Sequence, residues 1–167
     1  MERIIMVDQM RKEDWNQVKQ IYQDGIETGN ATFDTEPPDR EEWDRKYLQV
    51  CRLVAREGNQ VIGWAALLPV ASKDAFSGVA ELSIYLRTGS SGKGVGTKLM
   101  DELVKKSESK GFWTLQAGIF LENHGSIRLH EKFGFKMVGV RSRIGKLNGV
   151  WRDVLLMERR STVVGLD

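Results

Sequence analysis

A glycine-rich segment, Gly89–Gly96, separates two stretches of different apolar spacing, and this change limits the folds open to the chain. Before it, Val79–Leu86 is rich in alternating apolar residues, which is typical of a strand. After it, Leu99 and Leu103 recur at helical spacing until Gly111, a residue type that commonly ends helices. A strand that leads through glycines into a helix indicates an α/β fold.

Apolar periodicity and turn residues predict the other elements, which alternate in the order expected for a mixed sheet. Asp39 followed by Glu42 resembles a capping box, and Gly58-Asn59 and Asn148-Gly149 are hairpin signals. Residues 1–160 are expected to form one domain, with fraying from Arg159 and a flexible tail at 161–167. The predicted strands are Arg3–Val7, Arg52–Glu57, Val61–Val70, Val79–Leu86, Thr114–Ile119, Lys136–Ile144 and Val150–Met157. The predicted helices run from Trp15 to near Gly29, from Asp39 to Tyr47, from the glycine segment to Gly111, and from Ser126 to Phe133.

Composition narrows the function classes. The 25 Lys and Arg residues nearly balance the 23 Asp and Glu residues and are interleaved with them, which argues against a nucleic-acid partner. Cys51 is the only cysteine, so an internal disulfide is excluded, and we interpret it as a packed side chain. The longest apolar run, Val61–Ala71, is interrupted by Gly63 and Pro69 and is shorter than the ~20 residues of a membrane helix. The first ten residues lack a signal-peptide pattern, so a cytoplasmic protein without membrane contact is expected.

The loop Gly92-Lys93-Gly94-Val95-Gly96-Thr97 can present backbone N–H groups to an anion at the start of a helix. A pyrophosphate suits such a loop, although a turn without a ligand fits the same residues. A Walker A loop would need glycine in place of Arg87 and serine or threonine in place of Gly94. The dinucleotide fingerprint would need glycine in place of Leu99, so both nucleotide patterns fail.

Several linked motifs resemble one enzyme family, with order and spacing kept from about Arg3 to Glu158. The loop G-K-G-x-G-x-K-L at 92–99 resembles the acetyl-CoA pyrophosphate loop of the GNAT superfamily of N-acetyltransferases. Residues 123–135 resemble its second cofactor signature, N-x-x-S-x-x-L-(H/Y)-x-x-x-G-F. The stretches 31–37, 81–86, 126–131 and 149–154 resemble the phosphinothricin / methionine-sulfoximine acetyltransferase branch. This resemblance implies a single-domain α/β fold with a central mixed, mostly antiparallel sheet flanked by about four helices.

The resemblance also implies acetyl-CoA as co-substrate and no metal. Backbone amides of a central strand are expected to bind the pantetheine arm, the glycine loop the pyrophosphate, and the start of the following helix another part of the cofactor. These residues are, respectively, Ile84, Tyr85 and Leu86; Gly92, Lys93, Gly94, Val95, Gly96 and Thr97; Asn123 and Ser126. The side chains of the strand residues are packed in the core by default, and Asn123 also suits a helix N-cap.

Acetyl transfer from a thioester to an amine needs a neutral amine, so a base must reach a substrate that is largely protonated at neutral pH. Glu81 stands within a strand pattern, where an acid is unfavourable unless it faces a cleft or the solvent at a sheet edge. The resemblance places an acid of the active site here, so we take Glu81 as the general base. His130 stands where many relatives carry a tyrosine that protonates the departing thiolate; a hydrogen-bonded structural histidine is the alternative.

For the amine substrate, the resemblance points to a small amino-acid-like molecule of the phosphinothricin, methionine sulfoximine or methionine sulfone type. The expected substrate-binding residues are Phe33, Glu36, Lys73, Asp74, Ala75, Phe76 and Phe133. Lys73 suits a carboxylate or phosphinate partner, with a solvated surface lysine as the alternative. The resemblance also implies a homodimer.

The chain departs from the family motifs at two positions, and two alternatives to the expected function stay open. The family loop commonly has glutamine or arginine where this chain has Ser91, which predicts weaker phosphate contact, and one form of the branch has histidine in place of Arg152, which leaves the substrate open. A peptide or protein N-terminus, or a polyamine, is an alternative acceptor. A non-catalytic acyl-CoA-binding module is a further alternative, against which Glu81 argues because a binder does not need that acid.

Overall fold

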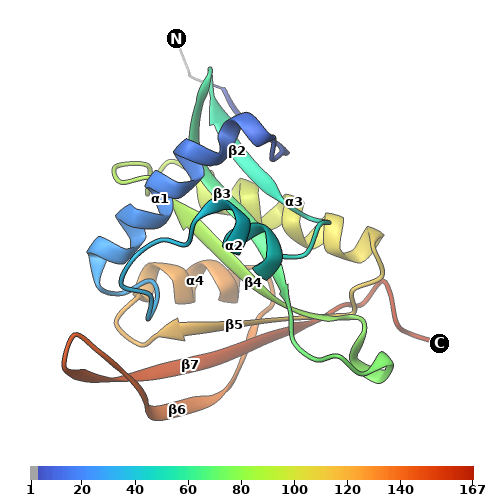
Figure 1. The fold of residues 1–167 in the computed structure, drawn as a ribbon. Helices are drawn as coiled ribbons and strands as arrows, with labels where there is room; N and C mark the ends of the chain where they lie inside the picture. Colours follow the sequence, from blue (N-terminus) through green and yellow to red (C-terminus); the bar gives the residue numbers. More distant parts are fainter. Residues whose placement is uncertain (1–3) are drawn as a thin grey trace.

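The computed structural model describes residues 4–167 and contains one seven-stranded sheet with four α-helices. Figure 1 shows the long β6–β7 hairpin along one end of the molecule and β1 and β2 at the other. The strands are β1 Ile5–Gln9, β2 Leu53–Glu57, β3 Gln60–Pro69, β4 Val79–Leu86, β5 Thr114–Phe120, β6 Lys136–Leu147 and β7 Val150–Arg160. The α-helices are α1 Trp15–Thr28, α2 Arg40–Lys46, α3 Val95–Ser109 and α4 His124–Lys132, and short 3-10 turns occupy Lys12–Asp14 (η1) and Asp74–Phe76 (η2).

The strand order is β1-β2-β3-β4-β5-β7-β6. Every neighbouring pair is antiparallel except β4 and β5, which are parallel. The prediction of a mixed, mostly antiparallel sheet with about four helices is therefore confirmed. The turn signals explain the hairpins: Asn148 and Gly149 both have positive φ, which suits the twist between β6 and β7.

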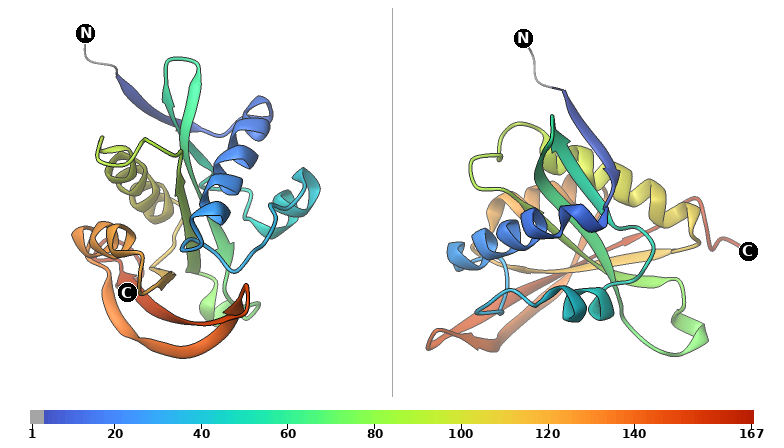
Figure 2. Two further views of the ribbon diagram at one scale, coloured as in Figure 1. Left: turned by 90° about the vertical axis from the view of Figure 1, so that its left-hand side faces the viewer. Right: turned by 45° about the horizontal axis from the view of Figure 1, so that its top comes forward.

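Helices cover both faces of the sheet. Figure 2 shows α1 and α3 on opposite sides of its central strands. Leu99, Met100 and Leu103 of α3 pack into one apolar cluster, whereas Val18 and Ile21 of α1 pack into a second cluster with Trp43 of α2. Both clusters draw on β3, whose side chains alternate between them, so this strand is buried on both faces.

The sheet opens between β4 and β5. Their parallel pairing covers only Val79↔Thr114 to Glu81↔Gln116, although β4 continues to Leu86 and β5 to Phe120. Antiparallel pairing with β3 holds β4 from Ala80 to Leu86, and pairing with β7 holds β5 along its whole length. The two halves of the sheet therefore part beyond Glu81 while each stays hydrogen-bonded internally.

The last two strands are longer than predicted. β6 continues to Leu147 and β7 to Arg160, because cross-strand pairing resumes after a bulge near Arg141 and β5 pairs with β7 as far as Arg160. The expected fraying from Arg159 was therefore wrong. Beyond β7, the Arg160 guanidinium donates hydrogen bonds to the carbonyls of Val164 and Gly165, which holds the tail against the strand end.

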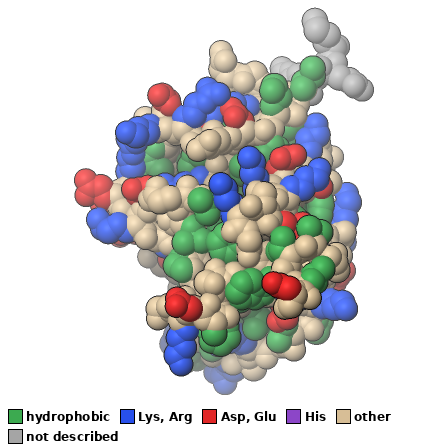
Figure 3. All heavy atoms as spheres, turned by 90° about the vertical axis from the view of Figure 1, so that its right-hand side faces the viewer, with side chains coloured by type: hydrophobic (Ala, Val, Ile, Leu, Met, Phe, Trp, Pro, Cys, Tyr) green, Lys and Arg blue, Asp and Glu red, His purple; other side chains and the backbone are tan. Residues whose placement is uncertain are grey.

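Charged side chains of both signs are interspersed on the face shown in Figure 3, as the interleaved sequence predicts. No helix within residues 4–167 is both long and apolar enough to cross a membrane.

Candidate active site

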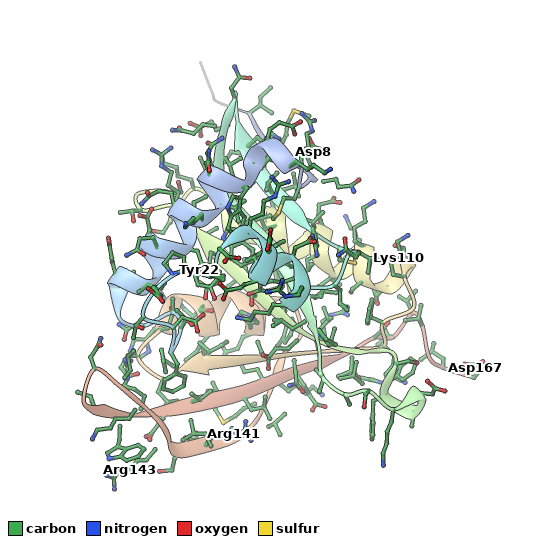
Figure 4. All side chains as sticks on the ribbon, in the orientation of Figure 1. Asp8, Tyr22, Lys110, Arg141, Arg143 and Asp167 are labelled. Carbon is green, nitrogen blue, oxygen red and sulfur yellow. The ribbon has the colours of Figure 1, made fainter. Side chains whose placement is uncertain are left out.

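A cavity of about 380 Å³ occupies the region where β4 and β5 part. Its wall includes residues 81–85 of β4, 117–120 of β5, and residues between 123 and 130 at the start of α4. The loop between α1 and α2 (residues 29–39, called the α1–α2 loop below) contributes residues 30–33, and β6 and β7 close another side. Figure 4 labels two wall residues from distant parts of the chain, Tyr22 on α1 and Arg141 on β6.

The cavity reaches both faces of the sheet. Side chains alternate along β4, so Leu82 and Ile84 pack with the α3 cluster while Tyr85 packs with the α1 cluster. Glu81 and Ser83 share the parity of Tyr85 and therefore face the same side. Since all five line the cavity, a ligand on one face can meet a ligand on the other through the opening.

Glu81 is half-buried and stands at the point where the pairing ends. Gln116, directly opposite on β5, donates a hydrogen bond from Nε2 to Glu81 Oε1 at 3.2 Å. Within the described residues 4–167, no lysine or arginine forms an ion pair with this carboxylate. One oxygen is therefore fixed by the sheet, and the other can accept a hydrogen bond from a molecule in the cavity.

Tyrosines line the cavity on the same face as Glu81. Tyr47 donates its hydroxyl hydrogen to Ser83 Oγ at 3.0 Å, and burial raises the pKa of Tyr47 to about 12. Tyr85 stacks on Tyr22 at 5.0 Å between ring centroids, and burial also raises the pKa of both phenols. Tyr22 in turn donates a hydrogen bond to Asp34 of the α1–α2 loop. These hydroxyls stay protonated at neutral pH and act as hydrogen-bond donors.

Sequence reasoning missed Tyr22 and Tyr47 as cavity residues, and it missed the two cations of the wall, Lys46 and Arg141. The helical spacing of Tyr22 assigns it to the core, which is also true, because the residue is almost fully buried. No sequence signal distinguishes a core tyrosine whose hydroxyl edge meets a cavity.

His130 is buried in α4 and lies in the cavity wall. Its Nδ1 is 2.7 Å from the Ser126 carbonyl oxygen, which can only accept, so the geometry assigns the hydrogen to Nδ1. The buried Nε2 has no hydrogen-bond partner among the described residues. Burial lowers the pKa of His130, only partly offset by the Ser126 carbonyl. The side chain is therefore neutral at pH 7, and its Nε2 is an acceptor.

The predicted cofactor loop follows β4 and leads into α3. Gly92 and Gly94 both have φ of +80°, and a Cβ at either would meet no atom within 4 Å. Their backbone is thus open to a ligand, and Gly94 is the N-cap of α3, where N–H groups favour an anion. Gly96 and Val95 differ from these two glycines because both are buried. A Cβ at Gly96 would meet the end of the Leu129 side chain at 3.1 Å, so α3 packs closely on α4 at this residue.

Four of the other predicted cofactor residues line the cavity. Ile84 and Tyr85 line the cavity from the part of β4 that has no β5 partner, and Leu86 ends the strand. Asn123 caps α4 by accepting a hydrogen bond from Ser126 N–H at 3.3 Å, and both residues line the cavity. Lys93 and Thr97 do not line the cavity, and Thr97 Oγ1 accepts a hydrogen bond from Lys132 Nζ at 3.2 Å.

The predicted substrate residues divide into two groups. Phe33 lines the cavity and packs edge-on against Phe120, with 4.8 Å between ring centroids. The rest do not line it: Glu36, Lys73, Asp74, Ala75, Phe76 and Phe133. Four of these form an exposed segment that includes η2. The structure therefore brings Glu81, His130 and Phe33 together and leaves the η2 segment apart.

Within residues 4–167, His, Cys, Asp and Glu side chains form no group of three that could hold a metal ion. Cys51 is buried, and burial raises its thiol pKa, in keeping with a packed side chain.

Comparisons with known proteins identify relatives along most of the chain. Residues 15–135 match the model of the acetyltransferase (GNAT) family. Phosphinothricin N-acetyltransferase of Streptomyces coelicolor is 30% identical over 158 residues, covering 89% of this chain and 91% of the relative. The L-methionine sulfoximine/L-methionine sulfone acetyltransferase of Pseudomonas aeruginosa is 31% identical, covering 83% and 84%. The solved structure of a GNAT superfamily phosphinothricin acetyltransferase from Sinorhizobium meliloti, in complex with acetyl-CoA, superposes with a TM-score of 0.88 at 28% identity, covering 98% and 91%.

Proposed function

This chain belongs to the acetyltransferase (GNAT) family and is an acetyl-CoA-dependent N-acetyltransferase, and we propose that its acceptor is the primary amine of a small amino-acid-like molecule. The names of the relatives support phosphinothricin, methionine sulfoximine or methionine sulfone as the substrate type. The observation that carries the proposal is the carboxylate of Glu81, fixed by Gln116 on one oxygen and free on the other, at the opening between β4 and β5.

In the proposed reaction, Glu81 accepts a proton from the substrate ammonium, directly or through one water. The amine nitrogen then forms a bond to the thioester carbonyl carbon, the C–S bond breaks, and the sulfur leaves with the electron pair. The proton that neutralises the sulfur comes from the attacking nitrogen, which must lose one as the amide forms. Backbone amides of β4 beyond Glu81 are suited to polarise the carbonyl because β5 does not use them.

His130 was predicted either to protonate the thiolate or to be structural. The geometry favours the structural alternative for the free enzyme, because Nδ1 donates to the Ser126 carbonyl and the unpartnered Nε2 is buried out of contact with the cavity space. We propose that His130 supports the start of α4 and does not supply the proton.

We assign acetyl-CoA binding to three backbone and side-chain groups. The open amides around Gly92 and Gly94 suit its pyrophosphate, the unpaired edge of β4 suits its pantetheine arm, and Asn123 suits the region between them. Ser91 adds no charge to this loop, so Lys93 is the side chain nearest in sequence that can neutralise a phosphate.

The residues of the η2 segment, with Glu36 and Phe133, remain proposed contacts of the amine or of a second copy of the chain. A homodimer and a cytoplasmic location likewise remain proposals. A peptide N-terminus or a polyamine is the alternative acceptor, and an acyl-CoA-binding module without catalysis is the alternative function.

Two measurements test the proposal. Release of free thiol from acetyl-CoA should depend on methionine sulfone, methionine sulfoximine or phosphinothricin and be much slower with spermidine or a peptide. Acetyl-CoA at about 100 times its Kd should stabilise the fold by about 2.7 kcal/mol, whereas ATP and NAD at equal concentration should do so much less. Faster turnover of the peptide or the polyamine would support the alternative acceptor, stabilisation by acetyl-CoA without thiol release from any amine would support the binding module, and equal stabilisation by ATP would overturn the cofactor assignment.

A further inference from the structure

We infer that Arg152 is a positioning residue that holds the α1–α2 loop in place as the wall of the amine site. The inference rests on the proposed function, because the cavity wall has a role in binding the amine only if the protein acetylates an amine. It assigns to a strand residue outside the cavity the task of fixing where Phe33 and Asn30 stand.

Arg152 lies on β7, and its side chain is only 12% exposed. Its Nη1 donates to the Gly29 carbonyl at 2.6 Å, and its Nη2 donates to Asn30 Oδ1 at 2.6 Å and to Glu122 Oε2 at 3.1 Å. The guanidinium therefore joins three segments that are distant in sequence: the end of α1, the link between β5 and α4, and β7. Two of its three acceptors belong to the α1–α2 loop.

The loop needs such support because it has no regular structure between Thr28 and Arg40. Gly29 ends α1 in the left-handed conformation, with φ of 73°, so the chain turns away from the helix at this residue. The carbonyl that receives the Arg152 bond is that of the same residue. The bond thus fixes the chain at the position from which the loop departs.

Asn30 links this clamp to the proposed cofactor side of the cavity. Its side-chain oxygen accepts from Arg152, and its backbone carbonyl accepts from Asn123 Nδ2 at 3.2 Å. Asn123 is also the N-cap of α4 and accepts from Ser126 N–H. One chain of hydrogen bonds therefore runs from Arg152 through the loop to the helix that carries His130.

Packing couples the same guanidinium to Phe33. Its central carbon lies 4.1 Å from the centroid of the Phe120 ring, and Phe33 packs edge-on against that ring. Phe33 also fits beneath Gly145 of β6, where a Cβ would stand 2.7 Å from its ring. Phe33 thus occupies a slot between Phe120 and Gly145, and Arg152 fixes both the ring beside it and the loop that carries it.

Arginine suits this role better than lysine. A planar fork can donate to several acceptors at fixed angles and stack on an aromatic ring at the same time, whereas an ammonium group is a compact charge that cannot match this geometry. Arg152→Lys should therefore rescue the function only in part, and Arg152→Met should lose it.

The test measures steady-state kinetics with a methionine sulfone acceptor, together with hydrogen exchange of the ligand-free protein. For Arg152→Met we expect the KM for the amine to rise about tenfold or more, with a smaller change in kcat and in the KM for acetyl-CoA. Arg152→Lys should fall between wild type and Arg152→Met. Amide exchange in residues 29–36 should become faster in both variants.

Arg56→Lys is the matched control. Arg56 is a similarly buried arginine, 15% exposed, that donates two hydrogen bonds of 2.6 Å to Asp14 far from the cavity wall. Loss of the guanidinium fork in Arg56→Lys should lower the free energy of unfolding without raising the KM for the amine. Asn30→Ala adds a second test, since it should raise the same KM in the wild type and have little further effect in Arg152→Met.

The outcomes distinguish a failure of the role of Arg152 from a failure of the proposed function. An unchanged KM for the amine with unchanged exchange in residues 29–36 would overturn the role of Arg152, and so would an equal rise of that KM in Arg56→Lys. If Arg152→Met does not fold, Arg152→Lys and Asn30→Ala still decide. If the wild type acetylates no amine, the proposed function fails, whereas the exchange measurement still shows whether Arg152 holds the loop.

Discussion

Replacing Glu81 by glutamine removes the proposed base while keeping the shape of the site. Gln116 donates to only one oxygen of the carboxylate, and a glutamine side chain at position 81 can accept the same hydrogen bond through its amide oxygen. The amide NH2 group then takes the place of the free carboxylate oxygen. Because that group donates instead of accepting, Glu81→Gln presents no acceptor for the substrate proton.

The size of the effect follows from what the base does. Loss of a general base typically lowers the rate by about 10²–10⁴, equivalent to about 2.7–5.4 kcal/mol of barrier. The pH dependence is sharper still. The variant can use only amine that is already neutral, and this fraction grows about tenfold per pH unit below the amine pKa. The ratio of wild-type to variant rates should therefore shrink by about that factor per unit until the amine pKa is reached.

The assay is initial-rate thiol release from pH 6 to 9.5, with acetyl-CoA affinity measured separately. Glu158→Gln is the control. Glu158 is exposed on β7, where it is the neighbour of Gln116 on the side away from β4, two strands and about 10 Å from Glu81. This control should match the wild type. A deficit in Glu81→Gln that is equal at every pH would mean that the carboxylate only positions the amine, and full activity would remove it from the mechanism.

Three further predictions concern the fold and the cofactor loop. Gly94→Val should raise the KM for acetyl-CoA sharply in steady-state assays, whereas Gly111→Val, which imposes similar strain at φ of +85° at the other end of α3, should not. Because burial lowers the pKa of His130, the folded state resists protonation of this side chain. Thermal melts should therefore show that stability decreases as the pH falls below about 6.5, by at most about 1.4 kcal/mol per pH unit, and His130→Asn should lack this decrease. Burial of Asp14 opposes its ionisation, but hydrogen bonds from Arg56 and from a backbone N–H lower its pKa below 3.8. In denaturant titrations, the stability that this ion pair contributes should persist above about pH 4 and be lost on acidification. Asp14→Asn should be less stable than the wild type at pH 7 and should not show this loss on acidification.

Local signals predicted most of the fold because they act within a few residues. Asp39 accepts a hydrogen bond from Glu42 N–H at 2.9 Å and begins α2, as its capping pattern indicates. The helix α1 ends next to Gly29, again as predicted, and this glycine adopts the left-handed conformation. In both cases the stabilising group lies within one helical turn of the backbone that it satisfies, so the sequence carries the whole cause.

The strand order could not be predicted in the same way. β7 lies between β5 and β6, although it follows both in the chain, and this placement depends on pairing between distant segments. It also explains the errors at Arg159 and Arg160: both pair with β5, at Leu115 and Thr114, and no local pattern signals that partner.

The site shows the same division. Glu81 was chosen because an acid within a strand pattern violates a local rule, as is expected at functional sites, and because the family resemblance places an acid there; its role as base stays a prediction. Tyr22 and Tyr47 violate no rule, so only the folded structure reveals them. Arg152 was visible as a departure from the family pattern, yet its meaning depends on Gly29 and Asn30, more than a hundred residues away.

The opening in the sheet connects these residues to the chemistry. Where β4 and β5 part, the β4 backbone beyond Glu81 loses its ladder partner on one side, an arrangement that is unfavourable unless another group pairs with it. An extended ligand with amide groups, such as a pantetheine arm, can supply that pairing as an added strand would. Its reactive end would then reach the opening from the α3 face, whereas Glu81 and the tyrosines lie on the α1 face. The two reactants would thus enter from opposite sides of the sheet and meet only at the opening, which would explain why the proposed base is the last paired residue of β4 and why Arg152 holds the loop proposed as the amine wall.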